Sequence, residues 1–233
     1  MTHEQLRNRS DDTTTAVKQE ARRRLAERRK PDLRTPALAA AAGVPDHDAQ
    51  QVFPGDWDLL TSLVLEAYHA MGDRAEAAAQ GARAAGASPL EEWTAICLAV
   101  RQWAAEDPDS YTLIWGSPVP GYEAPAETMV AGARTVLCLL AVLRDAHQQG
   151  ALETFADDPE PSEGMQRNVE PLAEGLLAGL PAPVIARMLT AWTQLHGMLA
   201  FDVYGHIAGV AADPVAFFAH SSTAMGRYVG LPR

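Results

Sequence analysis

The stretch "LAAAAGVPDHDAQQVFPGDWDLL", residues 38–60, decides the fold because two short helices and a glycine turn follow one another in it. The helix that opens at Thr35-Pro36 should end at Gly43, since glycine readily takes the left-handed conformation that terminates helices. Val44-Pro45 then starts a second helix, which runs to Val52 before "FPGD" closes it. This rhythm is typical of a helix-turn-helix, in which the second helix enters the major groove of DNA.

Helices are also predicted on both sides of this stretch. Apolar residues recur at every fourth position from Val17 to Leu25, on one face of a helix from about Thr14 to Arg29. We expect Asp56 to cap a long helix whose apolar stripe includes Trp57, Leu60, Val64, Tyr68 and Met71. These elements give three short helices and a long fourth one.

The rest of the chain also has helical patterns, and no strand pattern is evident. Further helices are expected from Ser88-Pro89 onward, in a short form after Asp107, and at 126–149, 165–180, 183–208 and 214–229. The fold class is therefore all-α, with an N-terminal three-helix helix-turn-helix head on a larger helical body for ligand binding and dimerisation. We place the head at residues 1–60, with the fourth helix beginning near 57, and the body at 61–233.

Composition agrees with a helical protein. Hydrophobic residues make up 47% of the chain, and alanine, which has the highest helix propensity, is abundant. We expect no apolar run long enough to span a membrane, and the polar N-terminus is unlike a secretory signal. Cys97 and Cys138 each lie in an apolar helical pattern, which favours buried free thiols over a disulfide or a metal site. The expected location is the cytoplasm.

Charge is distributed unevenly along the chain. Residues 1–34 carry a net charge of +4, whereas the other 199 residues carry −15. The basic segment is suited to a polyanion that the acidic body would repel, although basic N-terminal segments are often only solvated. The second helix of the motif is itself acidic at Asp46 and Asp48, and no Lys or Arg lies between Arg34 and Arg74.

Two groups of motifs resemble the tetracycline-repressor (TetR) family of one-component regulators. At the front, "LAAAAGV" matches the second helix and turn of the family, and "FPGDWDLL" matches its junction into helix four. At the back, "AWTQLHGMLAFDVYGHI" resembles the Trp-His-Gly (WHG) signature of one C-terminal subtype, and "YTLIWGSPVPGYEAP" matches the middle segment of that subtype. The resemblance covers the whole chain.

The resemblance implies that the head binds double-stranded operator DNA. The residues expected to contact DNA are Arg22, Arg23, Arg24, Arg28, Arg29, Lys30, Thr35, His47, Gln50 and Gln51. Basic side chains and the Thr35 hydroxyl would hold phosphates, and the last three would read base edges. The family positions that usually hold a phosphate-contacting Tyr and Lys fall on Gln50 and Asp56, so we expect fewer contacts, with repulsion added by Asp48.

The resemblance also implies a body that binds a small apolar effector and pairs with a second subunit. The expected effector contacts are Trp93, Trp103, Tyr111, Trp115, Tyr122, Trp192 and His196. Aromatic residues at helical spacing are also typical of plain core, and His196 could instead be a core histidine. The expected dimer contacts are Ile185, Met188, Leu199, Phe218 and Met225. A monomeric core is the alternative for these helices.

Three functions remain open on this reading. The first is a homodimeric repressor that leaves its operator when the effector binds, and the second is a ligand- or protein-binding protein whose degenerate helix-turn-helix no longer reads DNA. The third, an enzyme, is disfavoured because the scattered histidines show no metal-ligand spacing and there is no nucleophile elbow or phosphate loop. We expect no cofactor and no metal.

Overall fold

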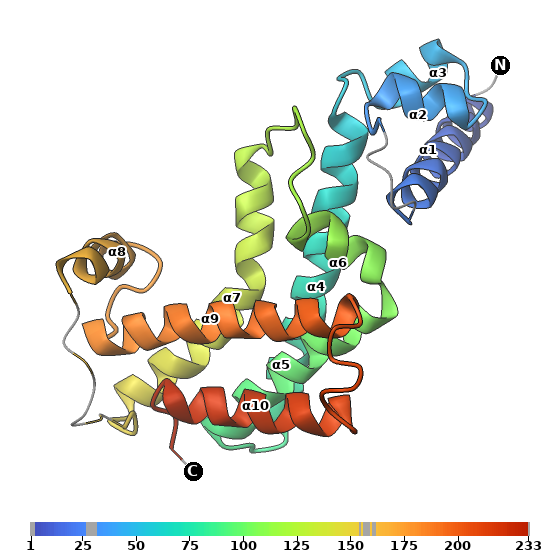
Figure 1. Cartoon of the computed structure of the whole chain (residues 1–233). Helices are drawn as coiled ribbons and strands as arrows, with labels where there is room; N and C mark the ends of the chain where they lie inside the picture. The colour runs from blue at the N-terminus through green and yellow to red at the C-terminus, as the bar shows by residue number, and fades with distance from the viewer. Residues whose placement is uncertain (1–2, 27–31, 154, 156–158, 160–161, 233) are drawn as a thin grey trace. The chain divides into compact units, whose positions relative to one another are not determined.

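The computed structural model describes residues 3–26, 32–153, 155, 159 and 162–232. In these ranges the regular structure is all α-helix. The helices are α1 (His3–Ala26), α2 (Thr35–Ala41), α3 (Asp46–Val52), α4 (Asp58–Ala84), α5 (Pro89–Glu106), α6 (Pro108–Trp115), α7 (Ala126–Gln148), α8 (Glu163–Glu174), α9 (Ala182–Val203) and α10 (Pro214–Tyr228). The predicted all-α class is confirmed (Figure 1).

The chain divides into two compact units. The first comprises residues 1–69 and 107–131, and the second comprises residues 70–106 and 132–233. The first unit thus holds the predicted head together with α6 and the loop that follows it. Helices α4 and α7 each contribute residues to both units.

The first unit is built around an apolar core shared by α1, α2 and the start of α4. Its buried side chains are Val17, Ala21, Leu33, Leu38, Phe53, Leu59, Leu60 and Leu63. Leu113, Val119 and Tyr122, from α6 and its loop, pack against the same core. Helices α1, α2 and α3 contact one another, as the helix-turn-helix pattern requires.

Helix α1 is longer at its N-terminal end than the apolar pattern predicts. It begins at His3, and its polar first half packs on α3. The hydroxyls of Thr14 and Thr15 donate to the carbonyls of Ser10 and Asp11, so they stay within the helix instead of ending it. The predicted stop at Pro31 lies outside the described residues.

The turn between α2 and α3 forms as predicted. Gly43 has a φ of +69°, the left-handed conformation expected after a helix. The start of α4 differs slightly: the helix begins at Asp58, whose carboxylate accepts from the backbone N–H of Gly55 at 2.7 Å. Asp58, rather than Asp56, therefore closes the turn before α4.

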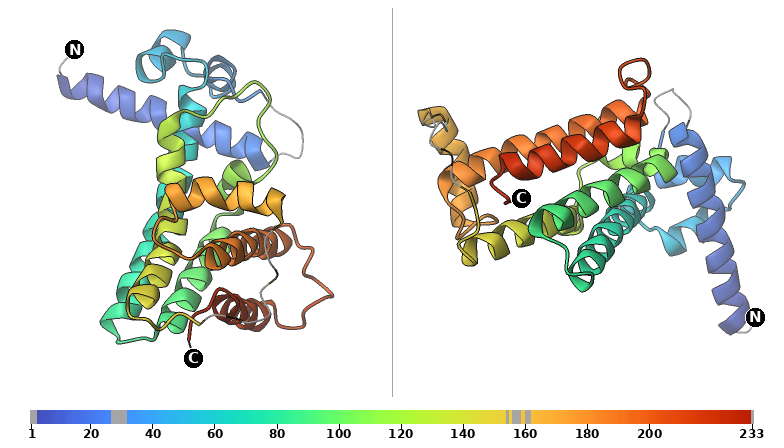
Figure 2. Two further views of the ribbon diagram at one scale, coloured as in Figure 1. Left: turned by 90° about the vertical axis from the view of Figure 1, so that its left-hand side faces the viewer. Right: turned by 90° about the horizontal axis from the view of Figure 1, so that it is seen from below.

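The second unit is organised around α5, α9 and α10. Helices α9 and α10 run antiparallel and side by side, and both pack on α5 (Figures 1 and 2). The predicted inward stripe of α5 is buried, with Trp93, Ile96, Cys97 and Val100 at most 1% exposed. Cys97 and Cys138 are free thiols, and burial raises the pKa of Cys97 to about 12.

Helix α7 departs from the expectation that no segment could span a membrane. By length and composition alone, Ala126–Gln148 qualifies as such a segment, although a core helix passes the same test. Leu139, Leu140 and Leu143 on this helix are fully buried by the protein itself. Packing within the chain accounts for this part of the apolar character of α7, whereas Met129 and Val130 near its start are exposed.

Two glycines test how closely the helices of the second unit pack. A Cβ added to Gly226 of α10 would lie 2.6 Å from Leu90 and 2.9 Å from Trp93, whereas one added to Gly81 of α4 would meet nothing within 4 Å. We predict that Gly226→Ala lowers the free energy of unfolding by about 1–3 kcal/mol through overpacking. Gly81→Ala is the matched control and should raise it by about 0.5–1 kcal/mol. Chemical denaturation measures both, and equal effects would contradict the packing described.

Candidate nucleic-acid interface and ligand site

Helix α3 has one exposed polar face. Asp46, His47, Gln50 and Gln51 are all exposed, whereas Ala49 on the opposite side is completely buried. The three residues predicted to read base edges therefore lie together on the surface of α3. The amide of Gln50 donates to the Asp46 carboxylate at 2.8 Å, one helical turn away.

Asp48 does not belong to this face, which corrects the prediction that its charge opposes DNA. The residue is only 8% exposed, and Arg9 of α1 donates to its Oδ2 at 2.6 Å. Its other oxygen, Oδ1, lies 2.8 Å from Nε2 of His47. Both carboxylate oxygens are thus bonded inside the head, where a buried charge needs such partners.

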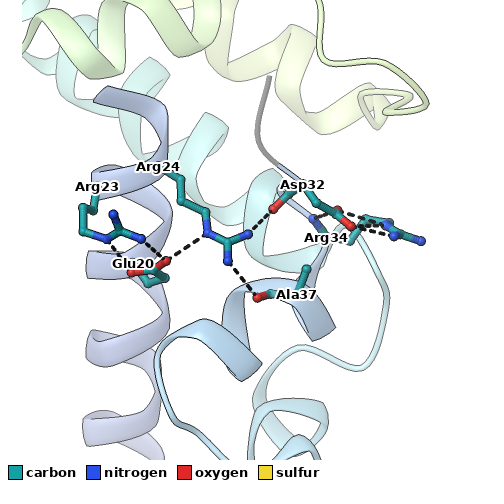
Figure 3. A network of polar contacts seen from close by, with 6 residues as sticks. All are labelled: Glu20, Arg23, Arg24, Asp32, Arg34 and Ala37. Carbon is teal, nitrogen blue, oxygen red and sulfur yellow. Dashed lines mark hydrogen bonds and ion pairs between the residues drawn. The ribbon is translucent and has the colours of Figure 1, made fainter. Parts of the chain in front are cut away.

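The basic residues near the end of α1 form a network with the chain's own carboxylates (Figure 3). Glu20 receives two bonds from Arg23, at 2.8 and 2.7 Å, and one from Arg24 at 2.9 Å. These bonds, those from Arg23 above all, lower the pKa of Glu20 to about 2 from an ordinary 4.5. Arg23 remains 59% exposed, so it can still be approached from solvent.

Arg24 has a structural position instead of the predicted phosphate-binding one. Besides Glu20, it donates to the carbonyls of Asp32 and Ala37, at 2.8 and 3.3 Å (Figure 3). Its side chain is only 19% exposed. Arg24 therefore fastens α1 to the start of α2, and Arg34 forms a separate pair with Asp32 that holds the pKa of that carboxyl at about 2.

Another carboxylate engages two further cations of α1. Glu66 of α4 pairs with Lys18 and with Arg22, the latter at 3.2 Å. The Arg22 side chain is 54% exposed and that of Glu66 is 45% exposed. A phosphate that approached Arg22 would compete with Glu66 for the same guanidinium.

Thr35, another residue predicted to contact phosphate, lies inside the head. Thr35 is only 2% exposed; its hydroxyl donates to the carbonyl of Gly55 and its N–H to that of Asp56. It therefore joins α2 to the turn before α4 within the head, which corrects its prediction as a surface contact. Arg28, Arg29 and Lys30 lie outside the described residues.

Three of the aromatic residues predicted to line an effector site lie in the first unit. Tyr111 of α6 is buried, and Trp115 packs edge-on against Tyr68 with ring centroids 6.3 Å apart. Tyr122 contacts Trp57, with ring centroids 5.7 Å apart, and its hydroxyl bonds that of Thr61 at 3.0 Å. The loop after α6 is thereby attached to the first turn of α4.

The other predicted effector residues lie in the second unit. Trp93 and Trp103 are buried, and Trp93 donates to the carbonyl of Ser222 at 3.1 Å, which ties α5 to α10. Trp192 and His196 are partly buried on α9, with ring centroids 4.3 Å apart. Burial lowers the pKa of His196 to about 4, so its imidazole is neutral near pH 7.

The five residues predicted to form the dimer contact lie inside the chain's own core. Ile185, Met188, Leu199, Phe218 and Met225 are at most 7% exposed, because this stripe of α9 and α10 faces inward. The outward face, formed by α9, α10 and the turn between them, instead has exposed apolar side chains that include Phe201, Val210 and Phe217, and Val215 and Tyr228 of α10 are exposed as well. A partner could reach these residues but not the predicted ones.

A groove lies on this outward face. It has a volume of about 480 Å³ and is lined by residues that include Gly197, Phe201, Val210 and Phe217. A Cβ added to Gly197 would meet no atom within 4 Å, so none of the described residues fills the space directly beside it. Both helices therefore present an apolar, uncovered surface.

Comparison with known proteins agrees with this architecture. Residues 93–225 match the family described as tetracyclin repressor-like, C-terminal domain. The chain belongs to the TetR family of transcriptional regulators. The match covers most of the predicted body, and the head has the helix-turn-helix that the resemblance implies.

Individual relatives extend the likeness to most of the chain. The HTH-type transcriptional regulators Rv1816 of Mycobacterium tuberculosis and Mb1846 of Mycobacterium bovis are each 27% identical over 205 residues, which are 84% of this chain and 83% of the relative. The crystal structure of the regulatory protein SCO4313 has 27% identity and a TM-score of 0.67 over 97% of this chain and 98% of its own. A protein of unknown function from Rhodococcus sp. RHA1, at 17% identity and a TM-score of 0.64, shares the fold over 92% of this chain and 94% of its own.

Sequence reasoning missed the carboxylates that partner the head's cations, and it missed Arg9. Glu20 could have been found, because its spacing of three and four residues from Arg23 and Arg24 places the charges on one helix face. Glu66 and Arg9 could not, since each bonds a residue about 40 positions away in the chain.

The Glu20 network predicts a pH dependence of the head's stability. Because the folded-state pKa of Glu20 is lowered, its contribution to stability is complete above about pH 4.5 and is lost as the pH falls toward 2. We predict that Glu20→Gln flattens the loss of stability between pH 5 and 2, measured by denaturation at a series of pH values. Glu163→Gln, at an exposed pair on α8, is the control and should leave the slope unchanged. An unaltered slope in Glu20→Gln would contradict the network.

Proposed function

We propose that this protein is a homodimeric, ligand-responsive repressor that acts in the cytoplasm and leaves its operator when a small apolar molecule binds the body. The observation that carries the proposal is the exposed polar face of α3 on a packed helix-turn-helix. Asp46, His47, Gln50 and Gln51 project from a helix whose other side is fixed by the buried Ala49 and by the Arg9–Asp48 pair. Such a helix can enter a major groove without rearrangement.

Phosphate contacts would come from the exposed cations of α1. Arg22 and Arg23 are more than half exposed, although each has a carboxylate partner. DNA phosphates can take over such bonds because exposed ion pairs contribute little to stability. The expected affinity is therefore modest and strongly dependent on salt.

Effector binding is proposed for the aromatic residues of the body. Trp192 and His196 are the best placed of these within the second unit, because they are partly buried and lie together. A neutral imidazole beside an indole suits an apolar or aromatic molecule with one hydrogen-bonding group. Trp93 and Trp103 are buried core residues of the same unit.

Dimerisation is proposed through the outward face of α9 and α10. Two copies that meet on Phe201, Val210 and Phe217 would cover apolar surface that a single chain leaves in water. A symmetric dimer would present two copies of α3, and repression would depend on a spacing that matches successive major grooves, about 34–36 Å apart. An effector that prefers another spacing would release the DNA.

Binding of the full chain to the DNA that flanks its own gene tests the proposal. We expect a retarded complex at low salt, dissociated by an effector drawn from a panel of apolar compounds. Failure to bind any duplex at low salt would contradict the proposal and support the alternative, a degenerate head. The self-paired cations of α1 are the observation that favours that alternative.

One variant tests whether the chain's own carboxylates limit DNA affinity. Glu66→Gln should release Lys18 and Arg22 for phosphates and raise affinity about fivefold, the effect of one exposed pair of about 1 kcal/mol. Fluorescence anisotropy at several salt concentrations measures this change. Glu163→Gln alters the net charge equally but lies on α8, so it should change affinity less than twofold. Equal gains in both variants would show a general charge effect and contradict the competition.

A second pair of variants tests the dimer face. The chain has a mass of 25.0 kDa, so light scattering after size-exclusion chromatography separates a monomer from a dimer. We predict that Phe201→Glu gives a monomer because it places a charge in the contact, while the chain stays folded because Phe201 is 53% exposed. Met129→Glu, at a 73% exposed apolar residue of α7, should remain dimeric. A monomeric wild-type chain would contradict the proposal.

A further inference from the structure

The exposed face of α3 has an unusual hydrogen-bonding character. Its side chains are Asp46, His47, Gln50 and Gln51, and it has no Lys or Arg. The commonest specific contact in the major groove, Arg or Lys to the O6 and N7 acceptors of guanine, is therefore unavailable from this helix. What the face offers instead follows from how its side chains bond to one another.

Gln50 is fixed with its carbonyl oxygen available. Its amide nitrogen lies 2.8 Å from Oδ2 of Asp46. An ionised carboxylate only accepts hydrogen bonds, so the NH₂ group of Gln50 must be the end that faces it. The oxygen of Gln50 is then left to accept from a base edge, while Asp46 takes one of the two N–H donors of the amide and so weakens the usual two-point pairing of Gln with adenine.

A carboxylate also orients the ring of His47. Its Nε2 lies 2.8 Å from Oδ1 of Asp48, another group that only accepts. A proton on Nε2 makes this contact favourable, so the ring nitrogen that faces Asp48 is not available to a base. Asp48 is itself held by Arg9, so this arrangement is anchored to α1.

We infer that α3 reads DNA mainly through hydrogen-bond acceptors, on Asp46 and Gln50, and that it selects the exocyclic amino groups of cytosine and adenine over the acceptor edge of guanine. This inference rests on the proposed DNA-binding function and names the bases that the same face would recognise. In the major groove cytosine N4 and adenine N6 donate, whereas guanine presents only acceptors. A guanine at a contacted position would oppose acceptor to acceptor, and both would lose water without a new bond.

Base analogues test this inference one atom at a time. Duplexes selected from a random pool by the full chain would be resynthesised with single replacements: 2-pyrimidinone for cytosine and purine for adenine, which lack the amino group, or 7-deazaguanine for guanine, which lacks N7. At contacted positions, we expect the amino-free analogues to lower the affinity about tenfold, because each removes one good base contact. We expect 7-deazaguanine to change the affinity less than twofold. The same analogues outside the contacted positions control for weakened base pairing.

A protein variant gives an independent reading of the same contact. Asp46→Asn keeps a side chain of the same size but can turn a donor toward Gln50 or toward the DNA. We expect selected sequences to shift toward guanine at the positions that Asp46 and Gln50 contact. Asp56→Asn removes an equal charge outside α3 and should leave the selected sequence unchanged.

The outcomes separate this inference from the proposed function. Selected duplexes that lose affinity with 7-deazaguanine but tolerate amino-free bases would overturn the acceptor readout and leave DNA binding intact. Equal affinity for all duplexes would also overturn the acceptor readout and leave DNA binding intact. If the chain retains no duplex from the pool even at low salt, both the proposed function and this inference are overturned.

Discussion

The head of this protein depends on how one buried carboxylate is satisfied. Asp48 lies on the helix that would enter DNA, yet it is bonded by Arg9 from α1 and lies beside His47 on α3. Without those partners a largely buried charge would destabilise the packing of α3, and with them it fixes α3 against the first helix. The same carboxylate also orients the His47 ring.

The basic side chains of the head form ion pairs with carboxylates of the same chain. Glu20 and Glu66 each hold at least one of the cations that the sequence alone assigns to DNA, and Asp32 pairs with Arg34. The strong lowering of the pKa of Glu20 and Asp32 shows that these contacts are electrostatically favourable in the folded chain. A polyanion must therefore compete with internal partners, which makes affinity sensitive to salt and to the carboxylates that surround each arginine.

Sequence reasoning succeeded where the determinants are local. Helix boundaries such as the turn at Gly43 follow from neighbouring residues, and the starts of the helices from α2 to α10 were anticipated to within a few positions. The ends of α8 and α9, at Glu174 and Val203, come earlier than the predicted positions 180 and 208. It failed where the partner is distant, as with Thr35 and Gly55 or with Asp48 and Arg9. It also placed the dimer contact on the inward stripe of α9, because a helix that is apolar all round does not reveal which side its own core covers.

The most direct test of this account is the affinity of Asp48→Asn for a duplex that the wild-type chain binds, measured at constant pH and salt. If Asp48 belongs to the scaffold of the head, removing its charge weakens the link to Arg9 and leaves α3 less well held, so affinity stays the same or falls. If the carboxylate faced the DNA, the same change would relieve repulsion. A clear rise in affinity would therefore contradict the account.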